Sequence, residues 1–419
     1  MKIITSIRLA VTFSLIMTRI ISVSAQTDNG WHANPVLVEK LSKERPGVNY
    51  YEEKIPPYTL PDLFKSNNGM KITSADLWYK IRRPEIIELF RKNVYGRVPE
   101  TPYKEEIKVT GSDALALDGL ATQKKIEITI EANERSLTIH LTLFTPNSVR
   151  HPVPVFLLID NWMSDNSGPS WKINGEFLPV NAALKRGYGM AVFSSSELDP
   201  DNFDNFKNGI HGLLDKNPRP PDAWGTISAW AWGASRCMDY LEKDKDIDHS
   251  KIAIVGHSRG GKTALWAGAE DTRFAMVVSN ESGAGGAALA RRRFGETVAR
   301  LNSVFPHWFC SNYNKYSDKE DSLPVDMHML LGLIAPRALY IDCADEDLWG
   351  DPHGSYISLY NAVPVFNLLG KKSDIPEIMP PLNEQLISGM VGFHIRDGVH
   401  NLLLRDWNRF MDFADKVFK

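Results

Sequence analysis

Residues 251–270 read KIAIVGHSRGGKTALWAGAE and carry the strongest indication of the fold in this sequence. Residues 251–255 form a short apolar run typical of a buried strand, and the small residues after position 260 suit a helix. Between them, residues 256–260 (GHSRG) match the pattern G-x-S-x-G. The pattern alone is a weak signal, but an elbow that exposes a nucleophilic serine needs a strand directly before it and a helix directly after it. The combination predicts such an elbow, with Ser258 as the nucleophile.

Short and nearly continuous apolar runs lie on both sides of this motif, as in a parallel sheet that is buried on both faces. Two segments rich in β-branched residues, 126–131 and 137–144, alternate between apolar and polar side chains and are separated by Asn133 and Glu134. They predict a hairpin over 126–144. We therefore expect an α/β fold, namely an α/β-hydrolase three-layer sandwich with a mostly parallel central sheet and helices on both faces. The runs are 153–160, 188–194, 252–255, 274–279, 338–343 and 390–393, and the helices expected between and after them are 177–186, 223–241, 263–270 and 402–418.

The first 104 residues differ in character from the rest of the chain. Residues 1–25 are similar to a secretory signal peptide, with a positive flank, an apolar run and a small-residue cleavage site, so we expect a secreted or periplasmic protein. Residues 26–104 are rich in Pro, Tyr, Asn and charge, and we interpret them as an N-terminal extension packed on the catalytic domain. The catalytic domain is expected at 105–419, with an insertion at about 160–222.

Composition excludes several classes of partner. A net charge of −3 without a basic run argues against nucleic acid, and no segment after the signal is long and apolar enough for a membrane span. Three cysteines, Cys237, Cys310 and Cys343, are too few for a disulfide framework, although one bridge stays open. No His/Cys cluster has metal-binding spacing, so we expect no metal and no cofactor. Asp199, Asp201 and Asp204 lack the glycine and the terminal Glu of a calcium loop, which favours a solvated loop.

A serine nucleophile needs a general base and an acid that orients it. In this fold the order along the chain is Ser, acid, His, so the base should lie near the C-terminus. His400 follows the last strand-like run and precedes the closing helix, and we choose it over His394. Two carboxylates compete for the acid, because Glu281 and Asp347 each follow a predicted strand. The residues alone do not rank them.

The chain from about residue 150 to 419 resembles the glucuronoyl esterases, carbohydrate esterase family 15, and in particular its bacterial members. The resemblance implies hydrolysis of esters between 4-O-methyl-glucuronic acid on xylan and alcohols of lignin. No single motif is specific, but together and in this order they are. The motifs are residues 257–262 (HSRGGK), 281–286 (ESGAGG), 333–337 (LIAPR), 346–349 (EDLW) and His400.

The resemblance also implies roles for individual residues. Arg259 is expected to stabilise the oxyanion through its backbone N–H and its guanidinium. Lys262, one helical turn further on, is expected to bind sugar hydroxyls, and Trp349 to border the sugar. Glu281 matches the acid position of fungal members, and Asp347 matches the alternative position of bacterial members. The implied partner is a carbohydrate substrate, and we expect a monomer.

This sequence also departs from the fungal pattern. His257 and Asn401 stand where fungal members carry a bridged pair of cysteines. The segment 291–308 is shorter and offers no clean match to the Gln and Glu that bind uronate there, with Glu296 as the candidate substitute. Two alternatives are another carbohydrate esterase, such as an acetyl esterase, which needs no cation at the elbow, and a non-catalytic sugar-binding relative, which would have lost Ser, His or both acids. The insertion, which carries Trp162 and Trp171, is expected either to wall the cleft or to be a packed or flexible surface segment.

Overall fold

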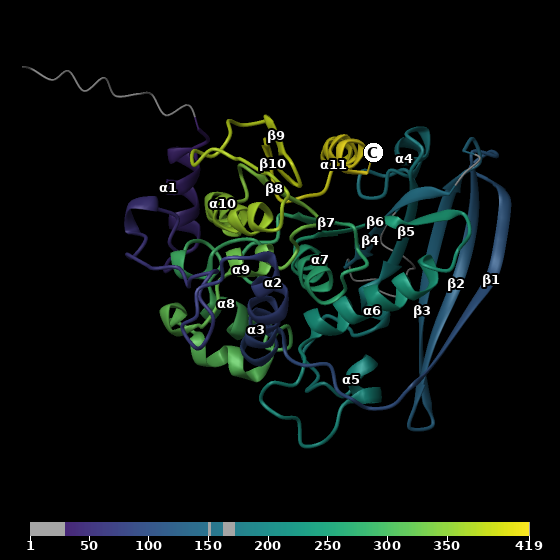
Figure 1. Cartoon of the computed structure of the whole chain (residues 1–419), viewed down its shortest axis with the longest axis horizontal. Helices are drawn as coiled ribbons and strands as arrows, with labels where there is room; N and C mark the ends of the chain where they lie inside the picture. Colours follow the sequence, from purple (N-terminus) through teal and green to yellow (C-terminus); the bar gives the residue numbers. More distant parts are fainter. Residues whose placement is uncertain (1–29, 150–151, 162–171, 419) are drawn as a thin grey trace, which may run out of the picture.

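The computed structural model describes residues 30–149, 152–161 and 172–418. In this part of the chain, the strands form one ten-stranded sheet in the order β1-β2-β3-β5-β4-β6-β7-β8-β10-β9 (Figure 1). The strands are β1 Lys104–Ala116, β2 Ala121–Ala132, β3 Arg135–Pro146, β4 Val153–Asp160, β5 Gly189–Ser194, β6 Ile247–His257, β7 Met276–Asn280, β8 Ala338–Ala344, β9 Gln385–Ser388 and β10 Val391–Arg396.

The centre of the sheet is parallel and its two edges are antiparallel. Strands β5, β4, β6, β7, β8 and β10 pair in parallel, as the apolar runs predict, whereas β1–β3 and β9 pair antiparallel. The predicted hairpin is formed by β2 and β3, with Asn133 and Glu134 at positive φ in its turn. The prediction missed β1, because this edge strand is largely exposed on both faces and so shows no alternation of apolar and polar residues.

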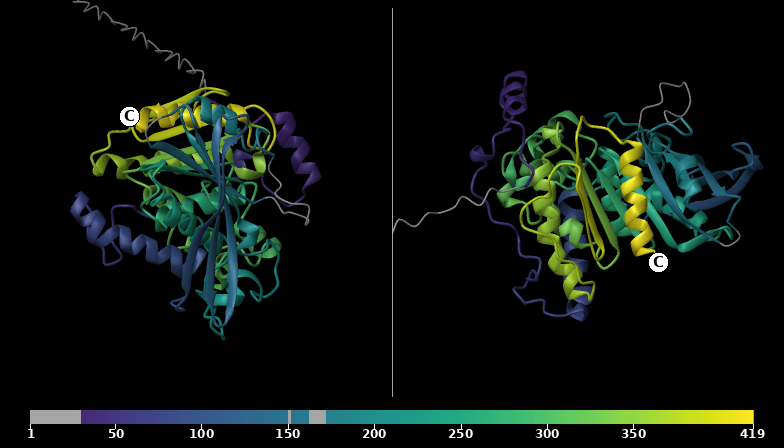
Figure 2. Two further views of the ribbon diagram at one scale, coloured as in Figure 1. Left: turned by 90° about the vertical axis from the view of Figure 1, so that its right-hand side faces the viewer. Right: turned by 90° about the horizontal axis from the view of Figure 1, so that it is seen from above.

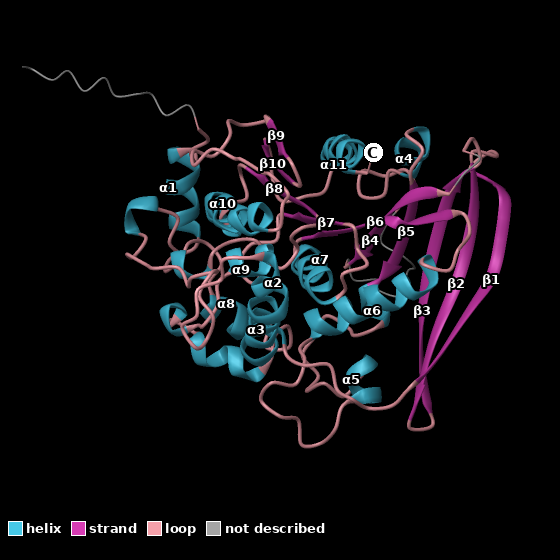
Figure 3. Ribbon diagram, viewed as in Figure 1, coloured by secondary structure: helices cyan, strands magenta, loops and turns pink. Residues whose placement is uncertain are grey.

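Helices cover both faces of the parallel strands, as predicted for a three-layer sandwich. Figure 3 shows α4 and α11 on one side of the sheet and α6 and α7 on the other. Side chains of β4 alternate between the two cores, with Phe156 and Leu158 facing α4 and α11, and Leu157 and Ile159 in the larger core with α6, α7, α9 and α10. The helices are α1 Pro35–Glu44, α2 Ala75–Leu77, α3 Arg83–Phe90, α4 Val180–Lys185, α5 Gly209–Leu214, α6 Thr226–Leu241, α7 Arg259–Glu270, α8 Val298–Val304, α9 Met327–Gly332, α10 Pro352–Leu368 and α11 Leu404–Val417.

The turn between β6 and α7 is the elbow of the fold. Ser258 has φ 56° and ψ −122°, in a region that non-glycine residues rarely adopt. A Cβ at Gly256 would clash with the carbonyl oxygen of Gly260, so the tight turn requires a glycine there. The helix begins directly at Arg259 rather than at the predicted residue 263, because the elbow leads into it without a connecting loop.

The N-terminal segment lies at the end of the molecule opposite to β1–β3 (Figure 2). Residues 75–95 of this segment form one unbroken helical stretch, since a widened turn at Trp78–Arg82 accommodates the missing N–H of Pro84. At its end, the Tyr95 ring stacks on Trp266 of α7 with 4.4 Å between centroids. The Tyr95 hydroxyl donates to the carbonyl of Gly285 at 3.0 Å, which joins this segment to the core of the sheet.

Several expectations lie outside the described residues, namely the signal peptide at 1–25 and both Trp162 and Trp171 of the insertion. Cys237, Cys310 and Cys343 are all described, and each is buried and free, so the bridge that the sequence left open is not formed. Within the described residues, no helix is both long and apolar enough to cross a membrane.

Candidate active site

A pocket of about 910 Å³ opens beside the elbow. The serine, the histidine and the two candidate acids of the predicted triad follow the carboxyl ends of β6, β10, β7 and β8, respectively, which is where an open α/β sheet places ligands. Further wall residues come from the loop around α8 and from residues 45–48 of the N-terminal segment. The structure brings all the residues predicted from the sequence to the lining of this pocket: Ser258, Arg259, Lys262, Glu281, Glu296, Asp347, Trp349 and His400.

The imidazole of His400 faces both candidate acids with the same nitrogen. Its Nδ1 lies 2.7 Å from Oδ2 of Asp347 and 3.0 Å from Oε2 of Glu281. Burial lowers the pKa of His400, but the hydrogen bonds to Asp347 and Glu281, together with their charges, outweigh burial and raise it to about 10. Either carboxylate can therefore hold the tautomer in which Nε2 is free to accept a proton.

The two carboxylates differ in their other partners. Glu281 is buried, and it accepts hydrogen bonds from Arg396 and, at 2.8 Å, from the backbone N–H of Asn401. Burial raises the pKa of Glu281 to about 7, the nearby Asp347 charge adds to this, and the hydrogen bond with His400 opposes it. Among the described residues, the carboxylate of Asp347 is hydrogen-bonded only to His400. The charge of Asp347 is thus directed at the imidazole, whereas that of Glu281 is shared.

Arg259 is held beside the nucleophile by an aspartate of the insertion. Its guanidinium pairs with Asp201 and lies over the ring of Trp308, 5.0 Å from the centroid. Asp201 also accepts hydrogen bonds from His307 at 2.9 Å and from Trp308 at 2.7 Å, and its side chain is only 4% exposed. The prediction of a solvated acidic loop is therefore wrong for Asp201, because contacts with Arg259 and the α8 region bury it.

The prediction of a solvated loop is also wrong for the neighbouring Asp199. It is buried and accepts a hydrogen bond from the Thr226 hydroxyl at 2.6 Å, at the start of α6. Asp204 instead caps backbone N–H groups in its own loop. Spacing within the loop could not reveal these partners, since they lie far away along the chain.

A second polar group forms the opposite wall of the pocket. The buried ammonium of Lys262 donates to the carbonyls of Ser282 at 2.8 Å and Ala284 at 2.5 Å, and to Oε2 of Glu296 at 2.7 Å. Oε1 of Glu296 accepts from the indole N–H of Trp349 at 3.2 Å. Burial lowers the pKa of Lys262, and the adjacent Glu296 opposes this shift. All three protons of Lys262 have acceptors in the protein, while the Glu296 carboxylate can accept further hydrogen bonds.

The ring of His257 packs against that of His400, the candidate base, in a contact that the sequence did not predict. Its ring centroid is 4.4 Å from that of His400, and its Nδ1 is hydrogen-bonded to Asn280. Burial, together with the neighbouring His400, holds the pKa of His257 well below its usual range, so the ring is neutral. The only hint in the sequence was its position next to Ser258, where fungal members carry a bridged cysteine.

Two groups of side chains have the donor atoms that a metal ion would need. In each group, the atoms lie within 4.8 Å of one another. The guanidinium of Arg396 contacts both groups, through Glu281 of one and Asp406 of the other. A fixed cation opposes a second cation at either place. The groups are His257, Glu281 and His400, and Asp342, His394 and Asp406.

An elbow serine and a histidine in contact with carboxylates, lining one pocket of an α/β-hydrolase fold, form the arrangement typical of a serine hydrolase. Comparison with known proteins narrows this class. Residues 128–370 match the model of the family described as glucuronyl esterase, fungi. The chain belongs to the glucuronoyl esterase family and is an ester hydrolase.

Prokaryotic relatives are similar over most of the chain, and a fungal relative over about two thirds of it. Carbohydrate esterase MZ0003, from an unknown prokaryotic organism, is 41% identical over 88% of this chain and 92% of its own length. The solved glucuronoyl esterase from Solibacter usitatus is 40% identical, with a TM-score of 0.82 over 88% of this chain and all (100%) of that one. A 4-O-methyl-glucuronoyl methylesterase from Podospora anserina is 30% identical over 67% of this chain and 54% of its own length.

Proposed function

We propose that this protein hydrolyses esters of glucuronic acid or 4-O-methyl-glucuronic acid, carried on xylan, with alcohols of lignin. The observation that carries the proposal is the pair of cations at the elbow, Arg259 and Lys262, one helical turn apart and both lining the pocket of Ser258. Hydrolysis of a simple ester requires neither cation, whereas a polar acyl group such as a uronate offers oxygens with which Arg259, and Lys262 through Glu296, can interact. The relatives named glucuronoyl esterase support this substrate class.

In the proposed mechanism, His400 Nε2 removes the proton of the Ser258 hydroxyl as its oxygen attacks the uronate carbonyl carbon. The resulting oxyanion is stabilised by the backbone N–H of Arg259 at the start of α7 and by its guanidinium. His400 then gives its proton to the departing alcohol oxygen, which leaves an acyl ester on Ser258. Water, deprotonated by His400, then attacks the carbonyl carbon of that ester, and the bond to the Ser258 oxygen breaks as His400 returns the proton to it, which releases the uronic acid and restores the serine.

We assign the orienting acid to Asp347, with Glu281 in support. Asp347 makes the shorter contact with Nδ1 and, in the described residues, has no arginine or lysine among its hydrogen-bond partners. A carboxylate with undivided charge stabilises the imidazolium that forms in the transition state more than one already paired with Arg396.

The wall formed by Lys262, Glu296 and Trp349 is proposed to receive the sugar. Lys262 fixes Glu296, whose carboxylate oxygens retain acceptor capacity for sugar hydroxyls. The half-buried face of Trp349 provides the flat apolar surface on which a pyranose ring packs. In this assignment, Lys262 acts mainly through Glu296 rather than through a proton of its own.

The wider setting is proposed from the sequence. We propose that residues 1–25 are a signal peptide and that the monomeric protein acts outside the cytoplasm or in the periplasm. Residues 26–104 are proposed to act as an extension that completes the pocket rim at residues 45–48, before the catalytic domain at 105–419.

The function is tested with two substrates offered separately, a benzyl or methyl ester of glucuronic acid and an acetylated xylan. We expect acid release from the uronate ester and its loss in the Ser258→Ala variant. Release only from the acetylated substrate would identify an acetyl esterase instead. Activity on neither substrate, with sugar binding unchanged by Ser258→Ala, would identify a non-catalytic binding protein.

A further inference from the structure

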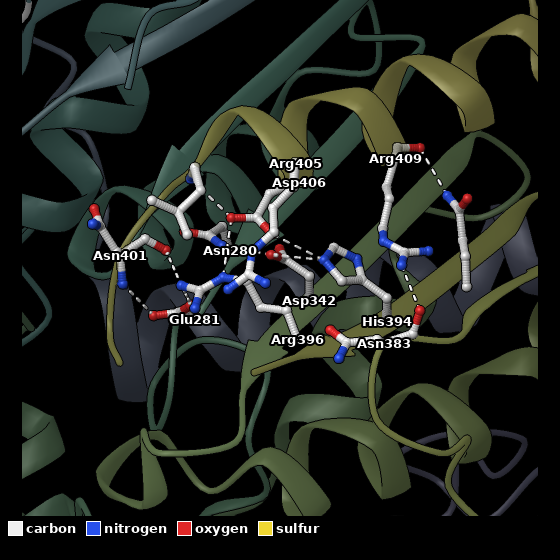
Figure 4. A network of polar contacts seen from close by, with 12 residues as sticks. Asn280, Glu281, Asp342, Asn383, His394, Arg396, Asn401, Arg405, Asp406 and Arg409 are labelled. Carbon is white, nitrogen blue, oxygen red and sulfur yellow. Dashed lines mark hydrogen bonds and ion pairs between the residues drawn. The ribbon is translucent and has the colours of Figure 1, made fainter. Parts of the chain in front are cut away.

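Arg396, the last residue of β10, is buried at 1% exposure beneath the loop that carries His400. Figure 4 shows its guanidinium between Glu281 and Asp406, close to Asn401. Nε donates to Oδ2 of Asp406 at 3.1 Å, Nη1 donates to the carbonyl of Asp397 at 3.2 Å, and Nη2 donates to Glu281. Every nitrogen of the guanidinium therefore has an acceptor.

Two further contacts of Arg396 lie on either side of the proposed base. Nη2 donates to the carbonyl of Val399 at 3.0 Å and to that of Asn401 at 2.7 Å, the residues directly before and after His400. Glu281, on the same nitrogen, accepts from the backbone N–H of Asn401 and contacts Nδ1 of His400. One guanidinium thus touches the backbone around His400 as well as a carboxylate on its ring.

Asp406 anchors the guanidinium from the opposite side. It accepts from Arg396, from the backbone N–H of Leu403 at 2.8 Å and from His394 at 3.1 Å, and it is fully buried at the start of α11. The strand end, the His400 loop and α11 are therefore joined by one rigid planar group. A lysine has a single ammonium and cannot reach acceptors spread in this way.

We propose that Arg396 is a positioning residue for catalysis, which fixes the backbone on both sides of His400 and aims Glu281 at its Nδ1. The inference rests on the proposed function of His400 as the base. An imidazole displaced by about 1 Å loses on the order of 100-fold in rate, while substrate binding need not change. The expected signature of Arg396 is thus a fall in kcat with little change in KM.

Three side chains from neighbouring elements contact the ring of His400 and have to be considered in the test. Nδ1 of His400 faces Glu281 after β7 and Asp347 after β8, and the ring packs on neutral His257 at the elbow. None of these three residues is substituted in Arg396 variants, so any change in kcat reports on their geometry rather than on the loss of a triad member.

The test compares Arg396→Lys and Arg396→Gln with a matched control, Arg337→Lys. Arg337 is half-buried, and its guanidinium donates to the carbonyls of Gly268 and Phe274, at the amino ends of β7 and β8 and so away from the carboxyl ends beside the pocket. We expect Arg396→Lys to lower kcat on the uronate ester about 10-fold and Arg396→Gln about 100-fold, with KM within about threefold. Arg337→Lys should lower the melting temperature without lowering kcat.

A spectroscopic measurement without substrate separates this inference from the proposed function. The hydrogen-bonded Nδ1 proton of His400, assigned by its absence in His400→Gln, should give a downfield proton resonance in the wild type. It should broaden or disappear in Arg396→Lys and persist in Arg337→Lys. If the wild type cleaves no uronate ester, the proposed function fails, yet this resonance still reports on Arg396.

Wild-type protein and a double variant complete the test. In the wild type, the guanidinium protons of Arg396 should exchange slowly with solvent, a measurement that requires no variant to fold. Combining Arg396→Lys with Glu281→Gln should cost less than the product of the two single effects, because Arg396 acts partly through Glu281. Rapid exchange in the wild type, or Arg396 variants with unchanged kcat and an intact His400 resonance, would overturn the proposal.

Discussion

Oδ2 of Asp347 and Nδ1 of His400 lie 2.7 Å apart, although the two residues are separated by 53 positions and follow different strands. Glu281 approaches the same nitrogen at 3.0 Å but divides its charge between His400 and Arg396. The structure thus offers a test of which carboxylate sets the reactivity of the base.

Replacing each carboxylate by its amide should affect turnover unequally. We expect Asp347→Asn to lower kcat about 100-fold or more and Glu281→Gln about 10-fold, since the amide at Asp347 removes the undivided charge that stabilises the imidazolium. Steady-state kinetics on a glucuronate ester measure both. Equal losses would show that the two acids share the role, and a larger loss in Glu281→Gln would reverse the assignment.

The pH dependence of catalysis should reflect the raised pKa of His400. The base acts only when neutral, so kcat/KM should still rise with pH above neutrality, toward the pKa of about 10. Asp347→Asn removes a charge that raises this pKa, and its acid limb should therefore shift to lower pH. A limb at the usual histidine pKa of 6.5 in the wild type would show that the two carboxylates do not outweigh burial at His400.

The same shift links His400 to folding. Because the folded-state pKa lies above the unfolded value, protonated His400 stabilises the fold fully below about pH 6.5, and this contribution is lost as pH rises toward 10. The free energy of unfolding of wild type and His400→Gln, measured by urea titration, should therefore converge between these limits. A difference that grows with pH would have the wrong sign.

Asp201 should support catalysis without touching the substrate. Asp201→Asn keeps the shape of the side chain but removes the charge that holds the Arg259 guanidinium, so we expect kcat to fall about 10-fold. Asp204→Asn is the matched control, because Asp204 lies in the same loop and caps backbone N–H groups there. Kinetics of the two variants decide the point, and equal activity would remove Asp201 from the machinery.

The buried pair of Lys262 and Glu296 should matter for stability as well as binding. Lys262→Met leaves Glu296 without its cation at 8% exposure, so we expect a loss of about 3 kcal/mol in the free energy of unfolding. The double variant Lys262→Met/Glu296→Gln should recover part of this loss. Urea unfolding measures both, and a double variant that is less stable than Lys262→Met would contradict the pairing.

The parts of this site that could be predicted from the sequence are those that depend on short stretches of neighbouring residues. Apolar runs predicted the parallel strands, and a serine between a strand and a helix predicted the elbow. Because the carboxyl ends of parallel strands meet at one edge of the sheet, residues that follow these strands are expected to lie together. Glu281, Asp347 and His400 each followed such a run. The motifs shared with a known family then supplied Arg259, Lys262 and Trp349.

The partners that hold these residues could not be predicted in this way. Asp201 meets Arg259 across 58 positions, and Arg396 meets Glu281 across 115, so nothing in the local sequence joins them. The loop that contains Asp201 even has the acidic composition typical of a solvated loop. Such contacts depend on how the insertion and the closing helix pack, which is a property of the whole fold.

The contact between His257 and His400 has a consequence for the chemical surroundings in which the enzyme works. Where the resembling fungal enzymes carry a covalent bridge, this chain holds its base by ring packing and hydrogen bonds, and its three thiols are buried and unpaired. A reductant therefore finds no bond to break near the nucleophile. Turnover should therefore be the same with and without dithiothreitol.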